Sequence, residues 1–200
     1  DLGLPSGLKW ADRNIGAVSP EDNGLYFQWG DIVGYTADQA GVDKTFNWAD
    51  YFDTTDGGST FNKYANDKLT VLEAADDAAT INMGLEYRMP TQADFNELVN
   101  NCTVTFIDIN GNEYSHLMTQ AGAIAKSNLK GIKFTGTNGN SIFIPASGFC
   151  RDSMFNSAYS YGYLWSSSLI SSNSMRAYYL SFDCYGSLGT NGGSNRDFGR

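Results

Sequence analysis

Two Asn-Gly dipeptides, each next to a stretch of alternating apolar and polar residues, constrain the fold of this chain more than any other feature. They are Asn110-Gly111 and Asn138-Gly139. Asn-Gly favours the positive φ angles of a two-residue hairpin turn, and alternation is typical of a strand with one buried face. The sequence therefore predicts antiparallel hairpins. The predicted strands are residues 103–109, 131–135, 141–146, 161–167 and 177–182, with a further short one at 8–10.

Residues 91–101 form the clearest predicted helix. Thr91 is a suitable N-cap, and Asp94 three residues later completes a variant of the capping box. The apolar residues at helical spacing are Phe95, Leu98 and Val99. Shorter helices are predicted from Ser19-Pro20 onward, within 72–79 and within 117–129.

The remaining segments are predicted as loops. Residues 35–67 are rich in Asp, Thr and Gly, and a surface loop of this length needs pinning. Four aromatic residues are candidates for that role: Phe46, Trp48, Tyr51 and Tyr64. Residues 186–195, which are rich in Gly and Asn, are predicted to form turns. At 200 residues, the chain is expected to form a single α+β domain.

The net charge of −9 is unevenly distributed along the chain. Residues 1–133 carry 9 basic and 19 acidic residues, whereas residues 134–200 carry four arginines and three aspartates. The first part is therefore an acidic scaffold and the second is nearly neutral. Nucleic acid and anionic membranes both require clustered positive charge, so neither is expected as the main partner. Direct membrane insertion is not expected either, since no apolar run is long enough.

The near-neutral part has the composition of a binding surface. It contains no Lys, Glu or Gln, and it is rich in Tyr, Ser, Gly and Asn. Tyrosine offers a large amphipathic contact at low entropy cost, while the small polar residues adapt their hydrogen bonds. The alternative is that some tyrosines only pack between strands. The predicted ligand-binding residues are Tyr159, Tyr161, Tyr163, Arg176, Tyr178, Tyr179, Asp183, Tyr185, Leu188, Asn191, Asn195 and Asp197.

Motifs for metal or cofactor chemistry are weak, and no cofactor, metal or catalytic residue is predicted. The single histidine, His116, argues against His-rich metal sites and His-based triads. The run Asp108-x-Asn110-x-Asn112 begins like a calcium loop but has Glu113 where that loop needs Gly. Its twelfth position is Thr119 in place of an acid, so a hairpin turn is the better interpretation.

Two other groups of residues have a structural and a functional interpretation. Asp76-Asp77 could bind a metal, but helix capping or a salt bridge, for instance to Arg88, is the favoured hypothesis. Cys150 and Cys184 could form a redox pair, yet buried free thiols are favoured because no strongly basic environment is evident. Cys102 is the third cysteine, and whether any two of them form a disulfide stays open.

Several motifs appear in order along almost the whole chain. They are residues 1–11 (DLGLPSGLKWA), 14–17 (NIGA), 20–22 (PED), 26–30 (YFQWG), 76–79 (DDAA), 87–91 (YRMPT), 138–146 (NGNSIFIPA) and 163–167 (YLWSS). This set resembles the Fibrobacter succinogenes major paralogous domain family. The resemblance implies a C-type lectin-like fold of the formylglycine-generating-enzyme type, with short helices packed on twisted antiparallel β-hairpins. It also implies an extracellular or cell-surface location in gut-type bacteria such as Bacteroidetes.

The resemblance carries two expectations about the C-terminal segment. Relatives usually close with a further strand, which is expected to be missing or cut here because the sequence stops at Gly199-Arg200. Some relatives are variable proteins of diversity-generating retroelements, in which Asn codons are rewritten. Every residue from 177 to 200 belongs to the set that such rewriting can reach.

The expected function is non-enzymatic binding of a protein or glycan ligand on a cell surface, of the adhesin or receptor-binding type. One alternative is an oxidase using Cys150 and Cys184, although the copper-binding relatives have their two cysteines close together. The other alternative is a purely structural module of a larger surface protein. Fold alone does not decide among these functions.

Overall fold

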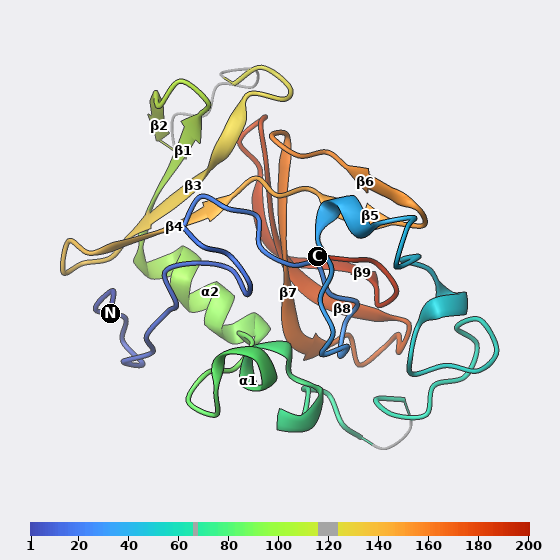
Figure 1. The fold of residues 1–200 in the computed structure, drawn as a ribbon. Helices are drawn as coiled ribbons and strands as arrows, with labels where there is room; N and C mark the ends of the chain where they lie inside the picture. Colours follow the sequence, from blue (N-terminus) through green and yellow to red (C-terminus); the bar gives the residue numbers. More distant parts are fainter. Residues whose placement is uncertain (66–67, 116–123) are drawn as a thin grey trace.

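The computed structural model describes residues 1–65, 68–115 and 124–200, and they form an α+β structure dominated by antiparallel strands (Figure 1). Three single turns of 3-10 helix lie at Ala37–Gln39, Trp48–Asp50 and Ala74–Asp76. The two α-helices are α1 (Ala78–Met83) and α2 (Gln92–Asn101). The strands are β1 (Thr103–Asp108), β2 (Glu113–Ser115), β3 (Leu129–Thr135), β4 (Ser141–Pro145), β5 (Phe149–Arg151), β6 (Met154–Asn156), β7 (Tyr161–Leu169), β8 (Arg176–Asp183) and β9 (Leu188–Asn195).

The strands form three antiparallel groups, in the orders β2-β1-β3-β4, β5-β6 and β7-β8-β9. Both Asn-Gly turns connect neighbouring strands of the four-stranded sheet, as predicted. Gly111 and Gly139 each have a φ of +84°, which a residue with a side chain rarely adopts. Asp108 Oδ1 accepts hydrogen bonds from the backbone N–H groups of Asn110 and Asn112, at 2.9 and 2.8 Å. The calcium-like run is therefore a hairpin turn that is closed by its own aspartate.

Helix α2 begins as the sequence predicts. The Thr91 hydroxyl accepts the Asp94 N–H, and the Thr91 N–H donates to Asp94 Oδ2 at 2.7 Å. Arg88 adds an ion pair to the same carboxylate at 2.6 Å. The capping box and the buried side chains of Phe95 and Leu98 hold the helix against the sheets.

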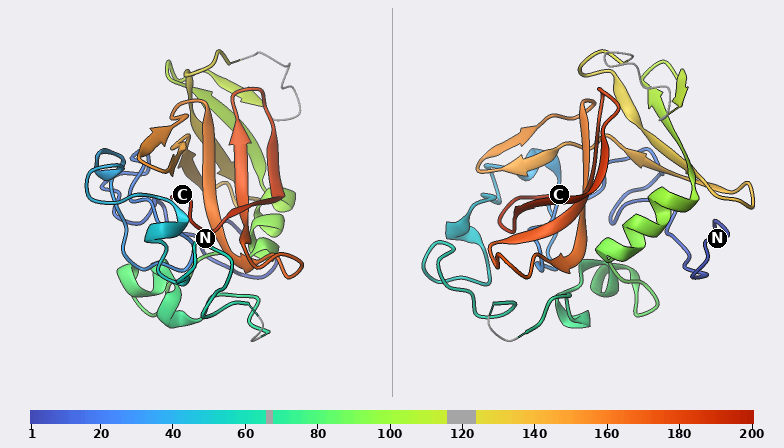
Figure 2. Two further views of the ribbon diagram at one scale, coloured as in Figure 1. Left: turned by 90° about the vertical axis from the view of Figure 1, so that its right-hand side faces the viewer. Right: turned by 180° about the vertical axis from the view of Figure 1, so that it is seen from behind.

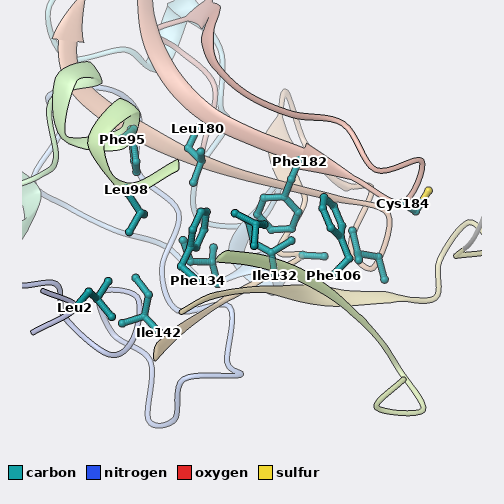
Figure 3. Packing of buried hydrophobic residues seen from close by; sticks show 14 of the residues in the cluster. Leu2, Phe95, Leu98, Phe106, Ile132, Phe134, Ile142, Leu180, Phe182 and Cys184 are labelled. Carbon is teal, nitrogen blue, oxygen red and sulfur yellow. The ribbon is translucent and has the colours of Figure 1, made fainter. Parts of the chain in front are cut away.

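The main core lies between α2, the four-stranded sheet and one face of β7-β8-β9 (Figure 3). Phe106 and Phe134 extend into it from β1 and β3, and Leu180 and Phe182 meet them from β8. All four side chains are at most 1% exposed. Leu180 and Phe182 therefore point from β8 into the core.

A second cluster covers the opposite face of the three-stranded sheet. Trp165 and Ala177 contribute from the sheet, and Phe27, Trp29 and Leu72 contribute from the N-terminal part. In both views of Figure 2, α2 lies on one side of β7-β8-β9 and the cyan segment near residues 40–60 lies on the other. The three-stranded sheet is thus covered on both faces, which explains why apolar and aromatic residues occur at successive positions along it.

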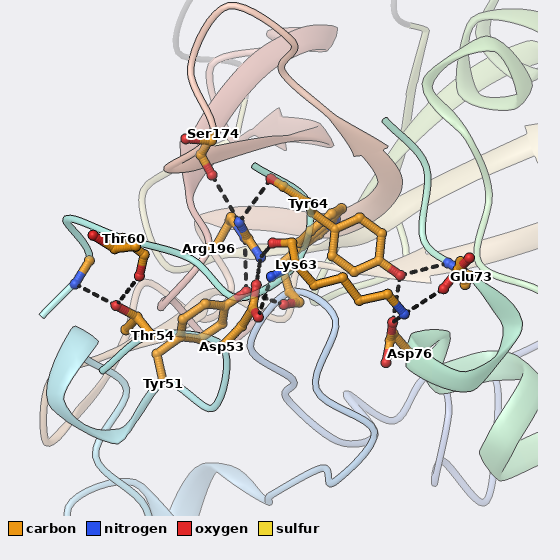
Figure 4. A network of polar contacts seen from close by, with 12 residues as sticks. Tyr51, Asp53, Thr54, Thr60, Lys63, Tyr64, Glu73, Asp76, Ser174 and Arg196 are labelled. Atoms are coloured by element: carbon orange, nitrogen blue, oxygen red, sulfur yellow. Dashed lines mark hydrogen bonds and ion pairs between the residues drawn. The ribbon is translucent and has the colours of Figure 1, made fainter. Parts of the chain in front are cut away.

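Residues 35–65 contain only short helical turns and isolated bridges, as the predicted long loop requires. Phe46, Tyr51 and Tyr64 are at most 2% exposed, and Trp48 packs edge-on against Tyr51. The fully buried Arg196 connects this segment to the end of β9 (Figure 4). Arg196, which the sequence analysis did not predict for this role, therefore joins the expected aromatic anchors.

The predicted turns at 186–195 are wrong, because most of this segment is strand β9. A Cβ at Gly192 would lie 2.7 Å from Cζ of Tyr179, and one at Gly193 would lie 2.1 Å from Cδ1 of Ile170. The glycines therefore make room for large neighbouring side chains within a sheet.

Three other sequence predictions need correction. Residues 8–10 form no strand, and Ser19-Pro20 begins a turn rather than a helix. Asp22 closes that turn by accepting the Ser19 N–H at 2.8 Å, and Gly24, with a φ of +74°, redirects the chain. Of the helix predicted at 117–129, residues 117–123 lie outside the described residues. Ser127 has a φ of +66° and Leu129 already belongs to β3, so the rest is not helical.

Candidate functional site

An exposed aromatic cluster lies at the end of the three-stranded sheet where β7 begins and β8 ends. Tyr159 is 54% exposed and Tyr185 is 50% exposed. Their loops are neighbours, because the Cys184 N–H donates to the Ser160 carbonyl at 2.9 Å. We call Tyr159, Tyr161, Asp183 and Tyr185 the tyrosine end of the sheet.

The inner members of the tyrosine end are held in place by their neighbours. Tyr161 is paired with Asp183 across the β7–β8 ladder and stacks on Tyr163, with ring centroids 5.9 Å apart. Asp183 Oδ1 accepts the N–H groups of Tyr185 and Ser187, at 2.9 and 3.0 Å. Burial and the nearby Asp183 raise the pKa of Tyr161, so its phenol stays protonated and can donate a hydrogen bond. The cluster can therefore offer ring faces, hydroxyl groups and one carboxylate to a ligand.

The other residues of the predicted binding surface do not join this cluster. Arg176 and Asn195 pair at the opposite end of the sheet, and Asn191 accepts a hydrogen bond from Gln92 of α2 at 2.9 Å. Apart from Asp197, the remaining residues are partly buried: Tyr163, Tyr178, Tyr179 and Leu188. The structure thus brings together one third of the predicted residues and distributes most of the others along the sheet.

Asp197 requires a correction, because it does not lie on a surface that a ligand could reach. Its side chain is buried, and Oδ1 has no hydrogen-bond partner among the described residues. Burial raises the pKa of Asp197 from 3.8 to about 6. Asp197 lies in the segment whose composition predicted a binding surface, but the turn after β9 directs its side chain inward.

The raised pKa of Asp197 predicts how stability changes with pH. Between about pH 4 and pH 6, Asp197 is protonated more fully in the folded state than in the unfolded chain, so its own contribution to the free energy of unfolding falls as pH rises through this range. Asp197→Asn removes the buried charge, and we expect it to raise the free energy of unfolding at pH 7.5 by about 1–3 kcal/mol. At pH 4 the same substitution should change it by less than about 0.5 kcal/mol.

Urea denaturation at both pH values measures this difference. Asp38→Asn is the matched control, because Asp38 is exposed and its replacement should change the free energy of unfolding by less than about 0.5 kcal/mol. An Asp197→Asn variant that is no more stable than the wild type at pH 7.5 would contradict the prediction.

The three cysteines are free thiols in the structure. Cys150 packs with Tyr26 and Phe46, whereas Cys184 belongs to the main core. Burial raises the pKa of both thiols, that of Cys150 to about 12, which opposes thiolate formation at neutral pH. The arrangement therefore gives the oxidase alternative no activated sulfur.

The acidic pair serves as a cap and as an ion-pair partner. Asp77 accepts the Thr80 N–H at the start of α1 and the Met89 N–H, at 2.9 and 3.0 Å through Oδ1. Asp76 pairs with Lys63 at 2.5 Å, whereas Arg88 pairs with Asp94. Capping is confirmed, and the suggested pairing with Arg88 is wrong. No three His, Cys, Asp or Glu side chains come close enough to hold a metal within the described ranges, and His116 lies outside them.

Two features that the sequence did not indicate lie on the face of the sheet near the N-terminal segments. Arg200 lies among aromatic rings, with its Cζ 4.3 Å from the centroid of Tyr163, 4.4 Å from that of Tyr179 and 5.0 Å from that of Trp165. A cavity of about 520 Å³ opens beside it. The cavity combines residues from distant parts of the chain, so local sequence patterns gave no signal for it.

Comparisons with protein-family models, curated proteins and solved structures find no match for this chain. In the part of the chain that the structure describes, no helix is both long and apolar enough to cross a membrane. Function is therefore inferred from the site itself.

Proposed function

We propose that this chain is a non-enzymatic binding domain of the C-type lectin-like class, which recognises a protein or glycan on a cell surface through the tyrosine end of its sheet. The α+β arrangement of short helices on antiparallel hairpins is compatible with that class. The proposal places the domain outside the cell or on its surface, as an adhesin or receptor-binding module.

The observation that supports the proposal most directly is that Tyr159 and Tyr185 are both exposed to solvent at the same end of the sheet. Each large ring has about half of its surface in solvent, although the chain has a covered three-stranded sheet in which to bury tyrosines. Tyrosines that only stabilise strands are expected to be covered, as Tyr163 and Tyr179 largely are. Exposed aromatic residues next to backbone turns and a carboxylate are typical of surfaces that bind.

The two alternatives make different demands. An oxidase needs a reactive thiol, and burial raises the pKa of Cys150 and Cys184. A purely structural module needs a flat polar C-terminal face, and the exposed Tyr159 and Tyr185 argue against it. A retroelement-diversified face is part of the proposal. It predicts a reverse-transcriptase gene and a near-copy of the segment that encodes residues 177–200 beside this gene.

The test is a screen against arrayed glycans and cell-surface proteins, followed by affinity measurements on each ligand found. Truncation of a central interface tyrosine often costs about 2 kcal/mol. We therefore expect the double variant Tyr159→Ser/Tyr185→Ser to bind at least about thirtyfold more weakly than the wild type. Tyr179 is left intact because it packs against Trp165 and Arg200.

Tyr87→Ser is the matched control, because Tyr87 is also exposed but lies between α1 and α2, away from the tyrosine end. It should bind like the wild type. Both variants are checked for an unchanged free energy of unfolding. Equal binding by the double variant and the wild type would refute the proposed site.

A further inference from the structure

The cavity beside Arg200 is formed by segments that are distant in the sequence. It is lined by residues of the N-terminal segment 8–27, of the region 74–90, and of strands β4 and β7. Its volume of about 520 Å³ is in the range of small-molecule sites. The apolar part of the wall includes Trp10, Ile15, Leu25, Met83, Met89 and Trp165. Leu85, which is 89% exposed, also lines it, so the apolar surface continues outward to solvent.

Two residues of the wall, Trp10 and Arg200, carry buried hydrogen-bond donors that have no partner among the described residues. Nε1 of Trp10 is buried and has no acceptor among the described residues. The same is true of Nε and Nη1 of Arg200, whose Nη2 donates to the neutral Ser194 hydroxyl at 2.6 Å. Leaving a buried donor unsatisfied is costly, and the cost is larger for a charged group. A ligand that supplies acceptor atoms would remove this cost.

More positive than negative side chains line the cavity, although the whole chain has a negative net charge. Lys9, Arg13, Arg88 and Arg200 line it, and Glu86 is the one acidic residue in its described wall. Arg13 and Arg88 have carboxylate partners, Asp12 and Asp94, that are not part of the wall. Among the described ion pairs, none includes Arg200, whose cation is enclosed by rings instead. In a chain of net charge −9, this local excess of positive charge favours an anion.

We propose that this cavity is a second binding site, separate from the tyrosine end, and that it takes a small apolar molecule carrying one anionic acceptor group such as a carboxylate. The apolar body of the ligand packs between Trp10, Met83 and Met89. The carboxylate accepts hydrogen bonds from the indole N–H of Trp10 and from the guanidinium of Arg200. Aromatic and aliphatic carboxylic acids have this chemistry.

The experiment uses three probes of one shape and different charge: 2-naphthoate, the neutral 2-naphthamide and the cationic 2-naphthylmethylammonium. Binding is measured by calorimetry on the full chain. We expect 2-naphthoate to bind at least tenfold more tightly than the amide, and the cation to bind more weakly still. Absence of 2-naphthoate binding up to millimolar concentration, or equal affinity for all three probes, would overturn the proposal.

Trp10→Phe tests the site while keeping an aromatic ring there, because a smaller phenyl ring replaces the indole and the N–H is lost. We expect this variant to bind 2-naphthoate five- to tenfold more weakly and to bind the amide with a smaller loss. Arg200→Met should remove the preference for the anion, and Tyr185→Ser should leave all three affinities unchanged. If Arg200→Met fails to fold, the Trp10→Phe result and the probe comparison still decide the question.

Indole proton resonances locate the bound probe. The chain has four tryptophans, and the indole signal lost in Trp10→Phe identifies that of Trp10. Nε1 of Trp29 and Trp165 already donate to backbone carbonyls, at 2.8 and 3.0 Å. We therefore expect 2-naphthoate to move the Trp10 indole proton downfield more than those two. A Trp10 signal that does not move while 2-naphthoate binds would overturn the assignment of the probe to this cavity.

Discussion

Arg196→Ala is expected to lower the free energy of unfolding by about 3–5 kcal/mol, because it leaves the buried carboxylate of Asp53 without its partner. The guanidinium is fully buried, with Nη2 2.5 Å from Asp53 Oδ2 and Nε 2.9 Å from the Tyr51 hydroxyl (Figure 4). Its Cζ lies 4.3 Å from the ring centroid of Phe61 and 4.8 Å from that of Trp29. The substitution therefore removes an ion pair, hydrogen bonds and aromatic contacts together.

Urea denaturation of the wild type and variants measures the change. Arg176→Ala is the matched control, since Arg176 is exposed on β8 and its guanidinium donates to the Gly193 carbonyl. We expect it to cost less than about 1 kcal/mol. The double variant Arg196→Met/Asp53→Leu should recover part of the loss, because no charge then remains buried. Equal losses for Arg196→Ala and Arg176→Ala would show that the buried network does not stabilise the fold.

Phe182→Ala is expected to cost a similar amount, about 3–5 kcal/mol, through a cavity in the main core. Phe182 is 1% exposed and meets Phe106 edge-on, with ring centroids 6.5 Å apart. Across the β7–β8 ladder it faces Gly162, where a Cβ would lie 2.0 Å from Cζ of Phe182. The ring therefore occupies the space that a side chain on β7 would fill.

This geometry predicts a measurable coupling between the two positions. Gly162→Ala alone should destabilise the fold by about 1–3 kcal/mol through overpacking against the ring. Combined with Phe182→Ala, the new methyl group enters vacated space, so the double variant should be at least about 1 kcal/mol more stable than additivity predicts. Tyr185→Ala, on the exposed loop after β8, serves as the control for loss of an aromatic ring. Strict additivity in the double-mutant cycle would contradict the contact.

Elements specified by local chemistry could be predicted from the sequence. The Asn-Gly turns close the hairpins because positive φ angles are needed there. Thr91 and Asp94 begin α2 because their capping box gives hydrogen-bond partners to backbone N–H groups at the start of the helix. Strand β9 could not be predicted in this way. Its glycines weaken a local strand pattern, and only the ring of Tyr179 and the side chain of Ile170 explain their presence.

The candidate site, too, could be predicted from the sequence only in part. Composition indicated that the last third of the chain carries exposed tyrosines, and Tyr159 and Tyr185 are half exposed. Composition did not separate them from Tyr163 and Tyr179, which face Arg200, because a count of residue types contains no direction. Which face of a strand is covered depends on what packs against it.

By itself, the sequence determined the hairpins, helix α2, the acidic N-terminal part and the near-neutral composition of the C-terminal part, because each depends on neighbouring residues or on residue counts. The tertiary structure alone decided the enclosure of Arg196 and Arg200, the burial of Asp197 and the cavity beside Trp10. Each depends on contacts between elements that are separate in the sequence, such as Arg196 with Asp53 and Arg200 with the rings of β7 and β8. Such long-range contacts depend on how layers pack, and local sequence patterns carry no record of that packing.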